Sequence, residues 1–276
     1  MLIYKDTFLT ASRQTDAYCL AAQVDASGLS YAVIDGEGVC RLLQTHPFSP
    51  AASYNDWAQT LDTTFREDEW LTKTYAASRW LFPSNKAMLV PESLFDAEKS
   101  YACLRYAVPL DELDEIHYRP LPACEAMLVF AAPNPPVNEI LKRYPNAQLI
   151  HPQESLLSLL AAQDGDNRVA LGITRELAGI AVFVGNKLVL SNTCPIRTFT
   201  DALYNLLLAL NAFHLTQDNF TLYYTGDIGE DGEELLRRYF PRLRELCDSH
   251  HHIQLGRPRA LIYHLLLTLF THPSCE

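Results

Sequence analysis

The sequence predicts an α/β protein built from two copies of one unit, each with a mixed sheet and helices on both faces. Two observations predict this. Residues 168–196 contain three short apolar runs separated by turn residues, which is typical of a three-stranded antiparallel meander. Residues 19–48 follow the same plan at an offset of 149, so that Val33 matches Val182. The chain therefore reads as a duplication.

A finer comparison of the two meanders strengthens the match. When one residue is dropped in the second turn, Thr45 aligns with Thr193 and Pro47 aligns with Pro195. Each meander then leads into a segment with helical spacing. Residues 1–17 lack periodicity and are expected to form an irregular lead-in or an edge strand.

Hydrophobic spacing and turn residues predict the remaining elements. In the first copy they are a helix at 53–65, extended runs at 73–82 and 86–91, a helix at 96–108, an extended run at 114–122, a central strand at 125–133, a helix capped by Asn134 and ending at Tyr144, a strand at 147–151 and a helix at 152–163. In the second copy they are a helix at 199–215, a strand at 220–226, a helix at 232–240, a strand at 251–256 and a helix at 259–270. The polar turn at 164–167 separates the copies, so we expect a first domain at 1–165 and a second at 166–276.

The composition excludes several classes of protein. A net charge of -11 over 276 residues argues against a nucleic-acid surface, and the basic stretch 237–244 reads better as an exposed helix face and its exit. The first residues show no signal peptide, and no apolar run is long enough to span a bilayer. The seven cysteines are scattered without metal-type spacing, which fits reduced thiols and predicts a cytoplasmic protein.

The strand and helix order of each copy is that of a ribonuclease H-like unit, and two such units in tandem make the actin-like ATPase architecture. Residues 125–196 resemble the middle of the bacterial actin-like proteins of type IV pilus assembly and of cell division. In both, a strand ending in Ala-Pro is followed by a helix, a strand, a helix and a phosphate-binding meander. The whole chain resembles an uncharacterised bacterial family with an actin-like ATPase fold and, more distantly, the acetate and sugar kinases.

The resemblance implies a site for ATP and Mg²⁺ made of three short pieces. The first is the hairpin tip Asp25-Ala26-Ser27-Gly28, in which Asp25 would hold Mg²⁺ while Ser27 and Gly28 would contact phosphate. An ordinary β-turn explains the same residues equally well.

The other two pieces are less complete. The second tip, Thr174 to Leu177, has neither glycine nor aspartate, and Glu176 brings a negative charge to the place of a phosphate. Arg175 could offset that charge, or the two side chains could form a polar hairpin tip. The third piece is a turn at Gly226 and Gly229, after a strand, that would contact the adenosine.

Other motifs add little. His250 and His252 alternate on an expected strand and could share a metal, but no second cluster supplies further ligands, so a solvated strand entry is favoured. The acidic stretch 111–115 could hold a divalent ion or form a solvated loop. Neither a nucleophile elbow nor a Walker A motif occurs.

Three hypotheses about function follow. The first is an actin-like protein that has lost efficient ATP hydrolysis and acts as a scaffold by binding a protein partner. The second is an active ATP-dependent phosphotransferase of the acetate and sugar kinase type. The third is assembly through an exposed surface, and the sequence leaves the oligomeric state open.

Overall fold

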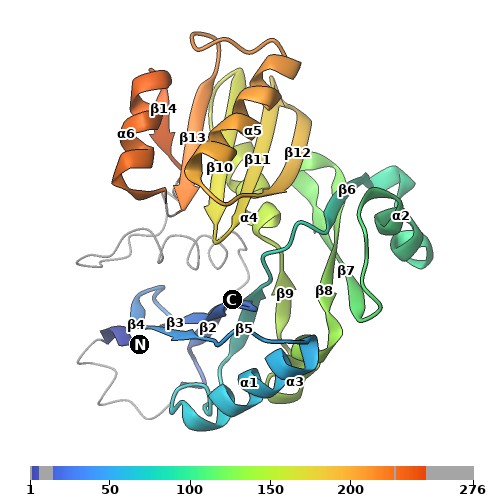
Figure 1. The fold of residues 1–276 in the computed structure, drawn as a ribbon, viewed down its shortest axis with the longest axis vertical. Helices are drawn as coiled ribbons and strands as arrows, with labels where there is room; N and C mark the ends of the chain where they lie inside the picture. The colour runs from blue at the N-terminus through green and yellow to red at the C-terminus, as the bar shows by residue number, and fades with distance from the viewer. Residues whose placement is uncertain (1, 6–14, 227, 247–276) are drawn as a thin grey trace.

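The computed structural model describes residues 2–5, 15–226 and 228–246, which form two lobes and a smaller sheet beside them (Figure 1). The first lobe contains a six-stranded sheet. In spatial order its strands are β1 (Leu2–Lys5), β4 (Cys40–Pro47), β3 (Gly28–Ile34), β2 (Cys19–Asp25), β5 (Ala77–Leu81) and β9 (Gln148–Ile150). Helices α1 (Tyr54–Glu67) and α3 (Asn134–Arg143) pack together beneath this sheet (Figure 1).

The second lobe contains a five-stranded sheet with helices on both faces. In spatial order its strands are β12 (Lys187–Pro195), β11 (Leu177–Val184), β10 (Asn167–Thr174), β13 (Thr221–Gly226) and β14 (Leu243–Glu245). Helix α5 (Phe199–Ala212) packs on one face, and α6 (Gly229–Tyr239) follows β13. Helix α4 (Pro152–Ala161) comes from the first copy but packs on the opposite face of this sheet.

The two sheets share one topology. The order β4-β3-β2-β5-β9 in the first lobe corresponds to β12-β11-β10-β13-β14 in the second. Ser30 pairs with Thr45 and Gly179 pairs with Thr193, as the sequence alignment predicts. Both meanders also carry a register shift at the matched residues Val33 and Val182. This agreement in register supports the duplication.

A separate antiparallel sheet interrupts the first copy between β5 and α3. It consists of β6 (Ala87–Pro91), β8 (Ala126–Pro133) and β7 (Asp114–Leu121), in that order, with α2 (Ser100–Ala107) between β6 and β7. The expected central strand at 125–133 is central in this small sheet. We call residues 87–133 the insertion, because the second copy has no counterpart to it.

Several expected boundaries were wrong. The helix at 96–108 divides into a short 3₁₀ turn, Ala97–Lys99, and α2, and the extended run at 73–82 begins only at Ala77. Asn134 does not cap α3 but lies inside it, where its side chain donates to Glu115.

In the second copy α5 stops at Ala212, because His214 adopts a positive φ of 53°, and α6 begins at Gly229. Strand β14 was not predicted. The strand expected at 251–256 and the helix expected at 259–270 lie outside the described residues.

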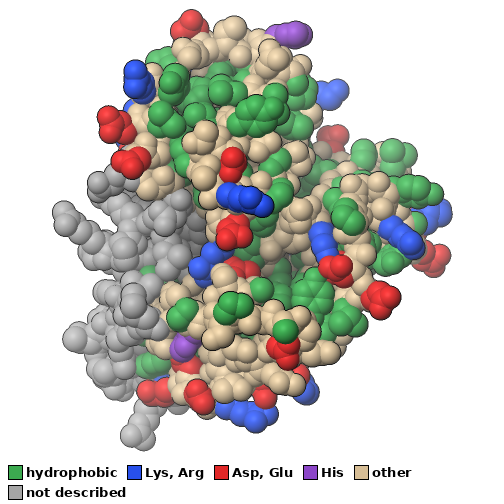
Figure 2. Space-filling view, in the orientation of Figure 1, with side chains coloured by type: hydrophobic (Ala, Val, Ile, Leu, Met, Phe, Trp, Pro, Cys, Tyr) green, Lys and Arg blue, Asp and Glu red, His purple; other side chains and the backbone are tan. Residues whose placement is uncertain are grey.

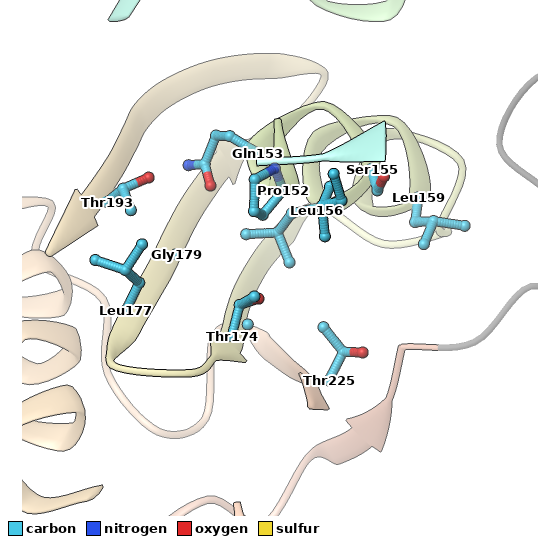
Figure 3. A pocket seen from close by; sticks show the side chains of 12 residues that line it. Pro152, Gln153, Ser155, Leu156, Leu159, Thr174, Leu177, Gly179, Thr193 and Thr225 are labelled. Carbon is cyan, nitrogen blue, oxygen red and sulfur yellow. The ribbon is translucent and has the colours of Figure 1, made fainter. Parts of the chain in front are cut away.

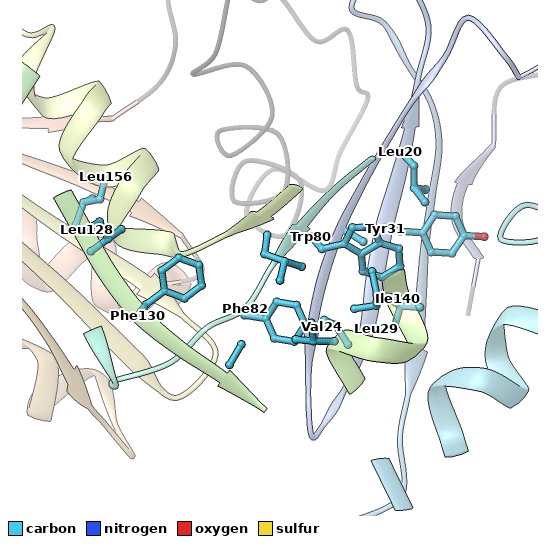
Figure 4. Packing of buried hydrophobic residues seen from close by; sticks show 14 of the residues in the cluster. Leu20, Val24, Leu29, Tyr31, Trp80, Phe82, Leu128, Phe130, Ile140 and Leu156 are labelled. Carbon is cyan, nitrogen blue, oxygen red and sulfur yellow. The ribbon is translucent and has the colours of Figure 1, made fainter. Parts of the chain in front are cut away.

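One hydrophobic core joins the two lobes. It contains Tyr31 and Trp80 of the first lobe and Phe130 of the small sheet, all fully buried between the sheets and helices (Figure 4). The same cluster continues through Leu156 of α4 to Phe183 of the second sheet. No helix among the described residues is both long and apolar enough to cross a membrane.

Candidate functional site

The tips of the two equivalent hairpins meet at the junction of the lobes. Arg175, at the β10–β11 tip, places its guanidinium Nε 3.0 Å from Oδ2 of Asp25 at the β2–β3 tip. Its Nη2 donates to Oγ of Ser30 over 3.4 Å. Arg175 has a φ of 55°, the left-handed conformation that turns this tip. From the sequence, Arg175 was expected either to offset the charge of Glu176 or to form a polar tip with it. In the structure its side chain contacts the first copy instead.

Both carboxylate oxygens of Asp25 are engaged. Oδ1 accepts hydrogen bonds from the backbone N–H and the hydroxyl of Ser27, which closes the turn. Oδ2 faces Arg175, although the Nε–H is not aligned with it for a hydrogen bond, so the contact is an ion pair. A metal ion at Asp25 would have to displace a guanidinium.

Gly28 is explained by packing against a neighbouring strand. A Cβ at this position would lie 2.6 Å from the backbone oxygen of His46 on β4. The glycine therefore allows β3 and β4 to approach each other at Pro47, its partner in the register. In the second copy Leu177 takes the equivalent place opposite Pro195.

Thr174 and Gly226 end two neighbouring parallel strands. Ile173 pairs with Gly226 between β10 and β13, so these two candidate residues lie at the same edge of the second sheet. Thr174 is buried, whereas Gly226 is partly exposed and has a φ of 101°. The structure thus brings Asp25, Ser27 and Gly28 to Arg175, and Thr174 to Gly226.

A small cavity lies beside this edge, between α4 and the second sheet (Figure 3). Its volume is about 30 Å³, room for one or two water molecules and far too little for a nucleotide. The hydroxyls of Ser155 and Thr225 line it and have no hydrogen-bond partner among the described residues. Water molecules would satisfy both groups.

A buried polar cluster in the first lobe was not predicted from the sequence. The Asp68 carboxylate, just after α1, accepts hydrogen bonds from Tyr31, Gln44 and His46 and from the backbone N–H groups of Trp70 and Leu71. Burial favours a higher pKa for Asp68, but these donors outweigh it and lower the pKa below its usual range. The cluster anchors the end of α1 to β3 and β4, and its only signal was an aspartate after a predicted helix.

The acidic stretch 111–115 is not a metal site in this structure. Nζ of Lys86 lies 2.6 Å from carboxylate oxygens of both Asp111 and Asp114. Among the described residues, no group of three His, Cys, Asp or Glu side chains is arranged to hold a metal ion. His250 and His252 lie outside them.

Comparison with family models identifies the protein family to which the chain belongs. The model of the family described as "Protein of unknown function (DUF3822)" matches residues 8–243. The chain belongs to this family. No curated protein matches the DUF3822 chain.

Solved structures show the fold. The DUF3822 chain is similar to a protein "with actin-like ATPase fold and unknown function" from Bacteroides thetaiotaomicron, with a TM-score of 0.76 and 16% identity over 92% of this chain and 96% of that one. It is also similar to a chain of the PilM-PilN type IV pilus biogenesis complex, with a TM-score of 0.57 and 16% identity over 94% and 99%. A polyphosphate/ATP-glucomannokinase from Arthrobacter sp. strain KM matches more weakly, at a TM-score of 0.41 and 11% identity over 93% and 98%. The predicted actin-like ATPase fold is confirmed.

Proposed function

We propose that this DUF3822 protein is a scaffold with an actin-like fold that does not hydrolyse ATP efficiently and that acts by binding a protein partner. The observation that carries the proposal is the ion pair between Arg175 and Asp25. In the nucleotide-binding arrangement that the resemblance implies, Asp25 would serve Mg²⁺. Here the cation next to Asp25 is the guanidinium of Arg175, which belongs to the second copy.

The chemistry of the second tip supports the same proposal. A phosphate cradle uses backbone N–H groups that glycine leaves accessible. Arg175, Glu176 and Leu177 all carry side chains at this tip, and the Glu176 carboxylate would repel a phosphate. The glycine of the first tip, Gly28, already has a packing role against β4.

A protein partner is the second part of the proposal. The PilM-PilN structure is a complex between proteins, one of which has this fold. At 16% identity that complex gives no partner for this chain, but a partner-binding role is compatible with a fold that hosts many functions.

We also propose a cytoplasmic location and a boundary between the repeats at 165/166. Cys40, Cys103, Cys124 and Cys194 are free thiols, which suits a reducing compartment. Burial raises the pKa of Cys40 to about 12, so this thiol is unreactive. The boundary follows Gly165, which has a φ of 123° in the turn between α4 and β10.

One observation favours the alternative, an ATP-dependent phosphotransferase. Asp25, Ser27 and Gly28 are retained at the first tip, and Gly226 opens a turn at the end of β13. In that case Asp25 would hold Mg²⁺ after release from Arg175.

Thermal unfolding with Mg·ATP, together with phosphate release, separates the two functions. A ligand present at about 100 times its Kd stabilises the native state by about 2.7 kcal/mol. The scaffold predicts no such rise in Tm and no phosphate release. A rise in Tm accompanied by phosphate release, with both lost in Asp25→Ala, would refute the scaffold and favour an ATP-dependent enzyme instead.

A further inference from the structure

The insertion at residues 87–133 is a distinct surface of the first lobe. It interrupts the duplicated unit between β5 and α3, and its small sheet packs its own cluster around Val90, Leu104 and Val129. In Figure 1, α2 lies at the outer edge of the molecule, away from both main sheets. Its position is therefore compatible with a role other than completing the duplicated fold.

Exposed hydrophobic side chains are concentrated on the insertion. Of the ten large ones exposed among the described residues, five lie there, although it is a small part of the chain. They are Leu94, Tyr101, Tyr106, Leu113 and Tyr118. Tyr106 is 94% exposed and Leu94 is 74% exposed, so neither contributes to a core. Figure 2 shows hydrophobic side chains gathered over α2.

The same segment is strongly acidic. Residues 92–115 contain seven Asp and Glu but only two Lys and Arg, a net charge of -5 out of -11 for the whole chain. Lys99 pairs with Asp96, and Lys86 pairs with Asp111 and Asp114. Of the four glutamates in this stretch, Glu115 accepts a hydrogen bond from Asn134. Glu92, Glu98 and Glu112 are exposed and form no ion pair among the described residues.

Exposed tyrosine rings and unpaired carboxylates on one segment are suited to basic side chains. An ammonium or guanidinium group binds the face of an aromatic ring and pairs with a neighbouring carboxylate. The chain already uses the first of these contacts: Nζ of Lys73 lies 3.7 Å from the ring centre of Trp70. The acidic charge repels nucleic acid from this surface.

We propose that the outer surface of the insertion, formed by α2 and its flanking turns, docks a basic segment of a protein partner. This proposal rests on the partner-binding function above and assigns its location and the chemistry of its ligand. The Lys or Arg side chains of the segment would contact the tyrosines and glutamates, and its apolar side chains would cover Leu94.

Helix α5 provides a comparison surface. It also exposes Tyr204, Leu207 and Leu208, but Asp201 is the only charged residue in Phe199–Ala212. An apolar surface without a charge pattern has no preference for a basic segment. Variants on α5 therefore control for a general effect of exposed hydrophobic side chains.

The experiment is a titration followed by fluorescence anisotropy. The probe is a labelled peptide of alternating lysine and leucine, with a peptide of alternating glutamate and leucine as its charge-reversed counterpart. We expect the basic peptide alone to bind, and Tyr106→Ser and Glu98→Lys each to raise its Kd about threefold or more. Tyr204→Ser and Glu234→Lys, at exposed positions on α5 and α6, are expected to leave the Kd unchanged.

Three results would overturn the proposal. In the first, the basic peptide does not bind. In the second, it binds with a Kd that the insertion variants leave unchanged. In the third, Glu98→Lys and Glu234→Lys weaken binding equally, which indicates attraction to the net charge alone. Phosphate release from Mg·ATP, assayed on the same samples, tests the proposed function separately. ATP turnover with peptide binding retained would refute the scaffold and leave the docking surface standing.

Discussion

Arg175 and Asp25 are the residues on which the function depends, and they lie in different copies of the duplicated unit. The sequence identified both hairpin tips and the missing glycine of the second. It did not predict the ion pair, because a contact between residues 150 positions apart depends on how the two sheets are placed. The role of Gly28 was hidden for a different reason: the nearest atom belongs to the neighbouring strand β4 of the same sheet and not to its own turn.

The strength of the ion pair can be measured in a double-mutant cycle. The Arg175 and Asp25 side chains are 30% and 18% exposed, so solvent screens the pair. For Asp25→Asn and Arg175→Gln, urea unfolding is expected to give a coupling energy of about 0.5–1 kcal/mol. Asp62 and Arg66, a more exposed pair on α1, are the control and should couple less. Zero coupling at the tips would contradict the pairing.

Gly28→Ala tests whether this glycine serves packing. The new Cβ would overlap the backbone oxygen of His46, which a strand of the sheet cannot move freely. We expect a loss of about 1–3 kcal/mol in the free energy of unfolding. Gly36→Ala, where the nearest atom is 3.9 Å away, should change little. Equal effects at the two glycines would show that the close approach is not the reason for Gly28.

Among the elements, α4 connects the lobes. The sequence predicted this helix with an end two residues beyond the observed one. It did not predict that the helix packs on the second sheet. Gly172 and Gly179 face each other in β10 and β11 and leave room for Leu156. The Arg168 guanidinium donates to carbonyl oxygens at the end of α4, among them that of Gln163. Glycine inside a strand is typical of a close contact, but it does not identify the partner of that contact.

His151, the residue immediately before α4, predicts that the stability of the fold depends on pH. His151 is fully buried; its Nδ1 accepts from the N–H of Gln153, and its ring also bonds the carbonyl oxygen of Ser84. Burial lowers the pKa of His151 to about 4, against about 6.5 in an unfolded chain. Its contribution to stability is therefore complete above pH 6.5 and is lost as the pH falls towards 4, by at most about 3 kcal/mol.

Urea unfolding between pH 4 and 7 measures this contribution. His151→Gln, which cannot titrate, should flatten the dependence in that window while lowering stability throughout. His214→Gln, at an exposed position, is the control and should keep the wild-type slope. An unchanged slope in His151→Gln would show that this histidine is not held neutral by burial.

At the scale of the molecule, the duplication was predictable because it repeats a hydrophobic pattern and a register. Val33 and Val182 were aligned from sequence, and both carry the same register shift. The insertion could not be separated from the duplicated unit, because its strands have the same apolar character as those of the main sheets. Only the pairing of β6, β8 and β7 reveals a separate sheet.

The shared core predicts that the lobes unfold together. The three tryptophans, Trp57, Trp70 and Trp80, all lie in the first copy, so their fluorescence reports that lobe alone. Far-ultraviolet circular dichroism reports both. Because one core cluster runs from Trp80 to Phe183, we expect the two signals to give the same urea midpoint. Two separate midpoints would show that the lobes are independent.

Calorimetric titration of Mg·ATP into the wild-type protein tests the central claim most directly, namely that the second hairpin tip pairs with Asp25 in place of a nucleotide. The ion pair and the glycine-free tip predict no measurable binding at nucleotide concentrations up to about 1 mM, the upper end of typical enzyme KM values. Saturable binding with a Kd in the micromolar range, abolished in Asp25→Ala, would contradict the claim.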